Sequence, residues 1–437
     1  MKKSYEKQKL KNRKLRWMRL DNAAKIYPAA RRQNWSNVYR VSVTFKEDID
    51  KNILESAIKK TYVRFPSICA RLKKGLFWYY LEELSSPPEI MQENSYPLTR
   101  MDKNETRKSA VRIIAYKKRL AVEIFHSLTD GNGAMVFLKT LAAEYFVQKY
   151  GVKIPDEFGI LSRDDKPDES EFEDSFLKYK GNVKASRKES IAWRLGGDNE
   201  PAGFLNNTCF KIPISVLKEK VKEKNASVTQ YLCAVMMMAL QKLQKERVKN
   251  VLKRKPIKVL VPVNLRKLLK SNTLRNFVYY TTPEMETRLG EYDFDEILKI
   301  IKCKMGQDIT QKQMIKKITT NVQSEETLIV KLMPLFIKNI VMKAIFDAVG
   351  ERTACLSLSN LGKIEVPESM REFIERFDFI LGVQATAPYN CGVLSFNDTV
   401  YINFIRNIKQ PYLEKAFHDC LMDMGIVATV ESNRIGE

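Results

Sequence analysis

One of the two histidines in this chain of 437 residues, His126, stands where a side chain can perform acid–base chemistry. It follows the apolar run "LAVEIF" and opens the stretch "HSLTDGNG". A histidine titrates near pH 6.5 and can take a proton from a hydroxyl or an amine around neutral pH. A lone histidine is structural about as often as it is catalytic. His126 is therefore a candidate general base.

The residues after His126 indicate how its loop is built. Asp130 is of the type that caps the start of a helix, while Gly131 and Gly133 let the backbone turn sharply and let another group come close. We predict a strand that ends at Phe125 and a helix over about 133–150. His126 would then lie on a loop that leaves a rigid scaffold, from which side chains can project into a cleft.

The other reactive residues form no recognisable site. Seven cysteines, at positions 69, 209, 233, 303, 355, 391 and 420, are scattered without a CxxC pair, and two histidines offer few further metal ligands. His418 and Cys420 lie two residues apart on an expected helix, so they do not face each other. We expect no metal site and no cysteine nucleophile. The scattered cysteines favour a reducing, cytoplasmic compartment.

Strands and helices that could position His126 are predicted along both halves of the chain. The first half has a strand over 37–45, a helix over 51–63, a hairpin around 117–118 and the helix over 133–150. The second half has strands over 208–214, 257–265 and 353–362, a helix opened by a capping box of Ser227 and Gln230, and a helix over 411–424. This mixture predicts an α/β (α+β) fold.

The length of the chain predicts two subdomains. We place a basic N-terminal tail at 1–20, a first subdomain at 21–155, an acidic and turn-rich crossover linker at 156–205, and a second subdomain at 206–437.

The chain is strongly basic, with a net charge of +23. Residues 1–20 alone hold nine Lys or Arg and a single Glu. The charge favours anionic partners such as phosphates, nucleic acid or an anionic membrane face, although a solvated lysine-rich surface gives the same composition. Residues 328–346 are apolar but interrupted by lysines and Pro334. They predict a helix pair packed on the core, with peripheral membrane contact as the alternative.

The pattern His126-Ser127-Leu128-Thr129-Asp130-Gly131 resembles the HxxxDG signature of the coenzyme-A-dependent acyltransferase superfamily, and in particular its bacterial alcohol acetyltransferase-like members. "PVNLR" (262–266) and "SNLG" (359–362) resemble two further motifs of that superfamily, in the same order. Positions near the start of the chain also match the family's first helix and its Arg-x-Pro turn: Asp50, Leu54, Ala57, Arg64, Pro66 and Arg71.

This resemblance implies two chloramphenicol acetyltransferase-like subdomains, each a mixed sheet with flanking helices, and a tunnel between them. It implies acyl-CoA as co-substrate, no permanently bound cofactor, and His126 as the general base. Asp130 would be structural and form a salt bridge with Arg266. Gly131 would leave room for the pantetheine arm. Ser359 or Asn360 would donate a hydrogen bond to the oxyanion, and Asn276 would line the channel.

Two departures from the family pattern narrow the expected type of enzyme. The chain lacks the Asp-Phe-Gly-Trp-Gly motif of plant members, and Phe125 stands where condensation domains and wax synthases carry a second histidine. We therefore expect a stand-alone, monomeric alcohol acetyltransferase-like enzyme that acylates a small alcohol, sugar or natural-product acceptor. The alternatives are a lipid or natural-product acyltransferase with longer acyl chains or amine acceptors at a membrane, and a basic nucleic-acid-binding protein, for which no signature motif is present.

Overall fold

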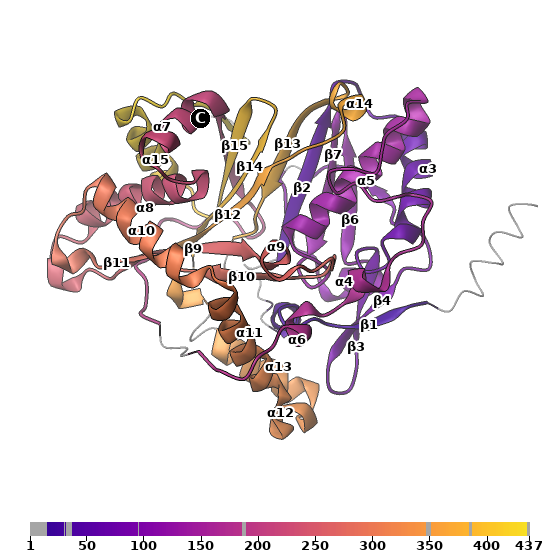
Figure 1. The fold of residues 1–437 in the computed structure, drawn as a ribbon, viewed down its shortest axis with the longest axis horizontal. Helices are drawn as coiled ribbons and strands as arrows, with labels where there is room; N and C mark the ends of the chain where they lie inside the picture. Colours follow the sequence, from indigo (N-terminus) through magenta and orange to yellow (C-terminus); the bar gives the residue numbers. More distant parts are fainter. Residues whose placement is uncertain are drawn as a thin grey trace, which may run out of the picture.

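The computed structural model of the protein describes residues 15–29, 31, 37–94, 96–185, 189–346, 351–383 and 387–434. Residues 1–14 of the predicted basic tail lie outside these ranges, whereas the short strand β1 (Trp17–Arg19) belongs to its end. Two large mixed sheets with helices packed beside them organise the described chain (Figure 1). The predicted α/β class is confirmed.

The first half of the chain is built around a five-stranded sheet in the order β13-β2-β7-β6-β5. Its strands are β2 (Val38–Phe45), β5 (Ile90–Met91), β6 (Val111–Tyr116), β7 (Arg119–Phe125) and β13 (Ile374–Ile380). Neighbours are antiparallel except for β5 and β6. β13 comes from the second half of the chain, so it joins the halves through the hydrogen bonds it forms with β2. The predicted subdomain boundaries stay predictions.

Helix α5 (Gly131–Tyr150) packs against β2 and against α3 (Lys51–Thr61). Buried side chains lie around most of the circumference of α5. The ring of Tyr145 stacks on Phe45 of β2, with ring centroids 5.3 Å apart. The helix begins at Gly131, two residues before the predicted start, because the Asp130 side chain accepts hydrogen bonds from the first free backbone N–H groups. It ends at Tyr150, and the C-cap residue Gly151 has a φ of 69°, which favours glycine.

A smaller sheet, in the order β1-β4-β3, lies beside the first half of the chain. It contains β3 (Ala70–Lys74) and β4 (Tyr79–Glu83), which form a hairpin with its tip at residues 75–78.

The second half of the chain forms an eight-stranded sheet in the order β10-β9-β12-β14-β15-β8-β16, with β11 paired to β9. Its strands are β8 (Asn206–Pro213), β9 (Ile257–Asn264), β10 (Val278–Thr281), β11 (Glu284–Met285), β12 (Leu356–Lys363), β14 (Tyr389–Phe396), β15 (Thr399–Arg406) and β16 (Thr429–Ser432). β12 runs parallel to both β9 and β14, and the other pairs are antiparallel.

Helix α8 (Val228–Arg247) packs against β9, α10 (Phe294–Asp308) and α15 (Tyr412–Asp423). The predicted capping box is present: the Ser227 hydroxyl accepts from the Gln230 N–H, and the Gln230 side chain accepts from the Ser227 N–H. Further α-helices are α2 (Ile26–Ala29), α4 (Lys103–Lys108), α6 (Ser175–Lys178), α7 (Ile214–Glu223), α9 (Leu265–Leu269), α11 (Gln311–Glu326) and α14 (Glu368–Arg371).

The predicted helix pair within residues 328–346 is present as α12 (Leu328–Leu332) and α13 (Leu335–Ile345), separated at Pro334. The expectation that this pair packs on the core is wrong for one face. Leu335 is buried, but Phe336 is 63% and Ile340 is 66% exposed, because these residues lie on the side of α13 that turns away from the protein. No helix within the described ranges combines the length and hydrophobicity that crossing a membrane needs.

Candidate active site

His126 follows directly on the last residue of β7, and neighbouring strands hold its backbone. Its N–H donates to the carbonyl of Asn37 at 2.9 Å, just before β2 begins. The Leu128 N–H donates to the Phe125 carbonyl at 3.0 Å and closes a turn under the histidine. The imidazole is therefore fixed at the end of a rigid sheet, as the sequence predicted for a loop that leaves a strand.

Two tyrosine rings enclose the imidazole of His126. Tyr27 of α2 stacks on it with centroids 4.4 Å apart and an interplanar angle of 14°, and Tyr39 of β2 meets it edge-on at 4.9 Å. Burial among these rings lowers the pKa of His126, while the carboxylate of Asp130 and the amide of Asn276 oppose this change. The neutral imidazole, which is the form that can accept a proton, therefore predominates at neutral pH.

A chain of hydrogen bonds sets the tautomer of His126. Its Nδ1 lies 3.1 Å from Oδ1 of Asn276, and Nδ2 of Asn276 donates to Oδ2 of Asp21 at 3.1 Å. The Asn276 amide must present its NH2 group to the Asp21 carboxylate, so its oxygen faces the histidine. Nδ1 then carries the hydrogen, and the lone pair of Nε2 is left to accept a proton.

Asp21, at the far end of this chain, is fully buried and held on both oxygens. Oδ1 accepts from the Ala24 N–H at 2.7 Å, and Nη2 of Arg275 lies 3.6 Å from Oδ2. Burial raises the pKa of Asp21, whereas the nearby Arg275 guanidinium and the Asn276 hydrogen bond favour its ionised form.

Asp130 has both carboxylate oxygens occupied by structural contacts. Oδ1 accepts from the N–H groups of Asn132 and Gly133 at 3.1 and 3.2 Å, which caps α5. Oδ2 accepts from Nη1 of Arg266 and from the Phe277 N–H, both at 2.9 Å. Because α9 carries Arg266, this ion pair links the His126 loop to the second half of the chain.

At Gly131 and Gly133, residues from the second half of the chain approach the His126 loop closely. A Cβ atom on Gly133 would lie 2.1 Å from Oγ1 of Thr129 and 2.5 Å from the carbonyl oxygen of Leu274. One on Gly131 would lie 3.1 Å from the side chains of Leu361 and Phe379. Glycine is therefore required at 133 by close backbone approach, and Gly131 is in contact with β12 and β13.

The predicted oxyanion residues lie on β12, whose end contacts the loop through Leu361. Both polar atoms of the Asn360 side-chain amide form hydrogen bonds. Nδ2 donates to Oγ1 of Thr229 at 3.0 Å, and Oδ1 accepts from the Gly362 N–H at 2.7 Å. Ser359 is half-buried and lies two residues before Leu361. Ser359 pairs with Gly392 of β14 in the regular part of β12, before the register between these strands shifts after Asn360.

Comparison with known proteins gives these features a context. A model of the alcohol acetyltransferase family matches residues 201–371. The structure of TRI101 from F. graminearum complexed with ethyl coenzyme A is similar at a TM-score of 0.63 and 10% identity, covering 96% of this chain and 100% of that one. The trichothecene 15-O-acetyltransferase TRI3 from Fusarium sporotrichioides is similar at 0.61 and 11%, covering 93% and 94%. The first condensation domain of the CDA synthetase is similar at 0.55 and 11%, covering 93% and 96%. A sequence search of curated proteins found no match.

The fold is that of the coenzyme-A-dependent acyltransferase superfamily. The predicted resemblance is confirmed by the family match over residues 201–371, which include PVNLR and SNLG, and by the shared fold. The HxxxDG residues 126–131 lie outside the matched range, so their role stays a prediction. The family match and the acetyltransferase among the similar structures support a CoA-dependent acyltransferase.

Several residues around His126 were not predicted from the sequence. Asp21, Tyr27, Tyr39 and Arg275 belong to no motif that we recognised. Asn276 was expected to line the channel, which stays a prediction, and its contact with Nδ1 of His126 was not predicted. The adjacent pair Arg275-Asn276 in "LRNF" was the available signal, since polar residues between buried neighbours need partners.

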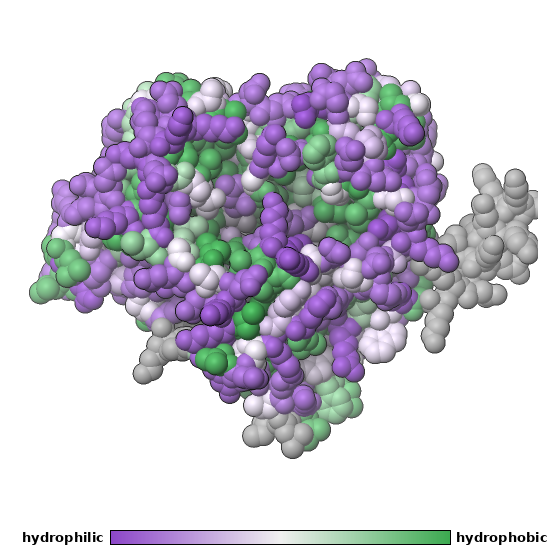
Figure 2. All heavy atoms as spheres, viewed as in Figure 1, coloured by the Kyte–Doolittle hydropathy of each residue, from purple (hydrophilic) through white to green (hydrophobic). Residues whose placement is uncertain are grey.

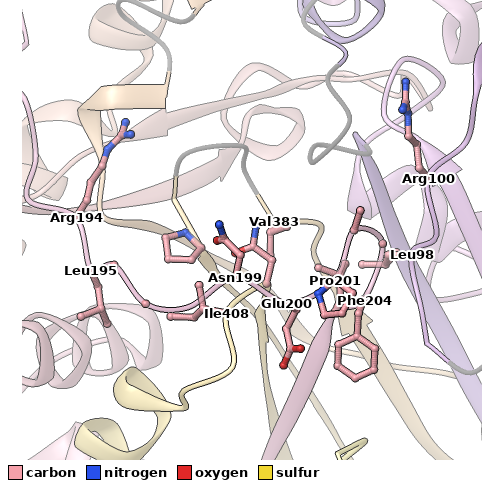
Figure 3. Close-up of a pocket in the computed structure, with 17 residues that line it drawn as sticks. Leu98, Arg100, Arg194, Leu195, Asn199, Glu200, Pro201, Phe204, Val383 and Ile408 are labelled. Atoms are coloured by element: carbon pink, nitrogen blue, oxygen red, sulfur yellow. The ribbon is translucent and has the colours of Figure 1, made fainter.

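A cavity of about 410 Å³ lies apart from His126 (Figure 3). Its lining residues come from the first half of the chain (Leu98, Arg100), from residues 194–205, and from the second half (Val383, Ile408). His126 is not one of the lining residues. The predicted tunnel past His126 stays a prediction.

Proposed function

We propose that the protein is an acyl-CoA-dependent O-acyltransferase that transfers an acyl group, acetyl in the simplest case, to a hydroxyl acceptor, with His126 as the general base. The observation that carries this proposal is the His126–Asn276–Asp21 chain of hydrogen bonds. It holds the hydrogen on Nδ1, and it leaves Nε2 able to accept a proton from an acceptor hydroxyl.

The reaction proceeds in one direct transfer. Nε2 of His126 takes the hydroxyl proton as the acceptor oxygen attacks the thioester carbonyl, and a tetrahedral oxyanion forms. Its collapse breaks the carbon–sulfur bond, and the His126 imidazolium returns the proton to the CoA thiolate. The products are an ester and CoA. No covalent enzyme intermediate is required, and the buried thiols are poor nucleophiles because burial raises the pKa of Cys233 and Cys355 to about 12.

The other site residues hold supporting positions in this proposal. Ser359 is the favoured oxyanion donor, because the Asn360 amide is already committed to Thr229 and Gly362. Asp130 and Arg266 fix the loop and take no part in proton transfer. Gly131 keeps the contact with β12 and β13 free of a side chain, along the expected path of the pantetheine arm.

A thiol-release assay tests this function. Purified protein is incubated with acetyl-CoA and pooled alcohols, sugars and amines, and free CoA and acylated products are measured by thiol reagent and mass spectrometry. CoA release that depends on a hydroxyl acceptor supports the proposal. Transfer that occurs only with amines, or no transfer from acetyl-CoA or longer acyl-CoA thioesters, contradicts it.

A further inference from the structure

Helix α13 presents an apolar face to solvent. Phe336 is 63%, Ile337 37%, Ile340 66% and Val341 40% exposed. Their spacing of one, four and five positions places all four on one side of the helix. A surface helix of a folded protein usually turns its apolar side inward, so this orientation is unusual.

The opposite side of α13 carries Lys338 and Asn339 and faces the protein. Lys338 is 2% exposed, its Nζ donates to the carbonyl of Phe77 at 3.0 Å, and it lies 3.7 Å from the centre of the Trp78 ring. Nδ2 of Asn339 donates to the Tyr79 hydroxyl at 3.2 Å. Specific polar and cation–π contacts therefore hold the helix in this orientation.

The tip of the β3–β4 hairpin extends this apolar surface. Leu76 is 75% and Phe77 is 40% exposed, and the Leu335 N–H donates to the carbonyl of Leu76 at 3.1 Å. Leu332 of α12 is 63% exposed. We call the following residues the apolar patch: Leu76, Phe77, Leu332, Phe336, Ile337, Ile340 and Val341. Figure 2 shows hydrophobic residues at the lower tip of the molecule, where Figure 1 places α12 and α13.

Lysines are the only charged residues within the segments that form this patch. Residues 73–78 and 328–346 contain no Asp or Glu, and they contain Lys73, Lys74, Lys331, Lys338 and Lys343. Lys74, Lys331 and Lys343 are exposed. An apolar surface bordered by positively charged side chains matches the boundary between headgroups and acyl chains of an anionic bilayer.

The apolar patch also lies close to the candidate base. α13 packs against α2, and Tyr27 of α2 stacks on the ring of His126. A single short helix thus separates a surface suited to lipid from the residue proposed to activate the acceptor.

We propose that the apolar patch docks the protein on an anionic lipid bilayer, with the apolar side chains below the headgroups and the exposed lysines on lipid phosphates. A second copy of the chain fits this surface poorly, because a symmetric contact would bring two sets of lysines together. This inference concerns membrane binding and does not depend on the proposed reaction.

Vesicle sedimentation tests this proposal with the full chain. Wild-type protein should sediment with phosphatidylcholine vesicles that contain phosphatidylglycerol, less with phosphatidylcholine alone, and less as salt is raised. Phe336→Ser/Ile340→Ser should lower the vesicle partition coefficient by about tenfold or more, because exposed apolar area drives insertion. Val427→Ser is the matched control: Val427 is 67% exposed and lies outside the patch, so this variant should bind as the wild type does.

A charge variant and a variant of the candidate base complete the experiment. Lys331→Glu/Lys343→Glu should abolish the preference for anionic vesicles. His126→Ala should bind vesicles as the wild type does, which separates docking from the reaction. Absence of wild-type binding overturns the proposal, as does equal binding by Phe336→Ser/Ile340→Ser. A wild-type dimer that this double variant dissolves, without any vesicle binding, would assign the face to a protein contact and also overturn it.

Discussion

Oδ1 of Asn276 lies 3.1 Å from Nδ1 of His126, although 150 residues separate the two in sequence. This contact joins the second half of the chain to the candidate base in the first half. It fixes which imidazole nitrogen carries the hydrogen, and it makes Asn276 a positioning residue in the proposed reaction.

Asn276→Asp should change the pH dependence of the reaction. Burial lowers the pKa of His126 in the wild type, so activity should fall only as pH decreases through that lowered value. A carboxylate against Nδ1 favours the imidazolium and raises the pKa of His126, which moves the acid limb of kcat/KM to higher pH. Asn276→Ala should lower kcat by roughly 10–100-fold, a part of what a general base contributes. An unchanged acid limb in Asn276→Asp would contradict the contact's role.

Arg266→Ala should destabilise the fold, because it leaves the buried carboxylate of Asp130 without its cationic partner. The free energy of unfolding, measured by denaturant titration, should fall by about 3–5 kcal/mol. Asp130→Asn/Arg266→Met removes both charges and should recover part of that loss. If the double variant is less stable than Arg266→Ala, the ion pair is not the source of the effect.

Gly133→Ala should destabilise the protein by about 1–3 kcal/mol, because the new methyl group would overlap the Leu274 carbonyl and the Thr129 hydroxyl. Gly306→Ala provides the control. Gly306 lies within α10 with open space around its Cβ position, so alanine should stabilise the helix by about 0.5–1 kcal/mol. Thermal and denaturant unfolding of both variants measure the contrast, and equal effects of the two substitutions would refute it.

Ser359→Ala should lower kcat with little change in KM, because an oxyanion donor acts mainly in the transition state. The expected loss is about 10²–10³-fold. Asn360→Ala should act differently, since Asn360 bonds Thr229 and the Gly362 N–H. Its main effect should be on the free energy of unfolding. A larger loss of kcat in Asn360→Ala than in Ser359→Ala would reverse the assignment.

Sequence patterns predicted the local part of the site well. An apolar strand followed by Asp130 and two glycines is a short-range signal, so the loop and the start of α5 were found within two residues. Arg266 was found only through the family resemblance, because its contact spans 136 residues. The contacts of Asn276 with Asp21 and with His126 depend on how the two halves pack, and the stacking of Tyr27 on His126 joins residues 99 positions apart. No periodic pattern of residues in the sequence predicts these contacts.

The orientation of α13 shows a second limit of sequence interpretation. The apolar composition of residues 328–346 predicted a helix pair, and both helices are present. Composition does not state which face turns inward. Lys338 and Asn339 face the protein beside the buried Leu335, because the hairpin offers them a carbonyl, a tryptophan ring and a tyrosine hydroxyl. The apolar side was thereby left outside.

The role of His126 as general base is tested most directly by comparing the two histidines of the chain in the thiol-release assay. His126→Ala should lower kcat/KM for acyl transfer by about 10²–10⁴-fold while acyl-CoA binding, measured by calorimetry, changes little. His418→Ala, on the partly exposed side of α15, should retain wild-type activity. If His126→Ala transfers acyl groups at the wild-type rate, the proposed mechanism is wrong.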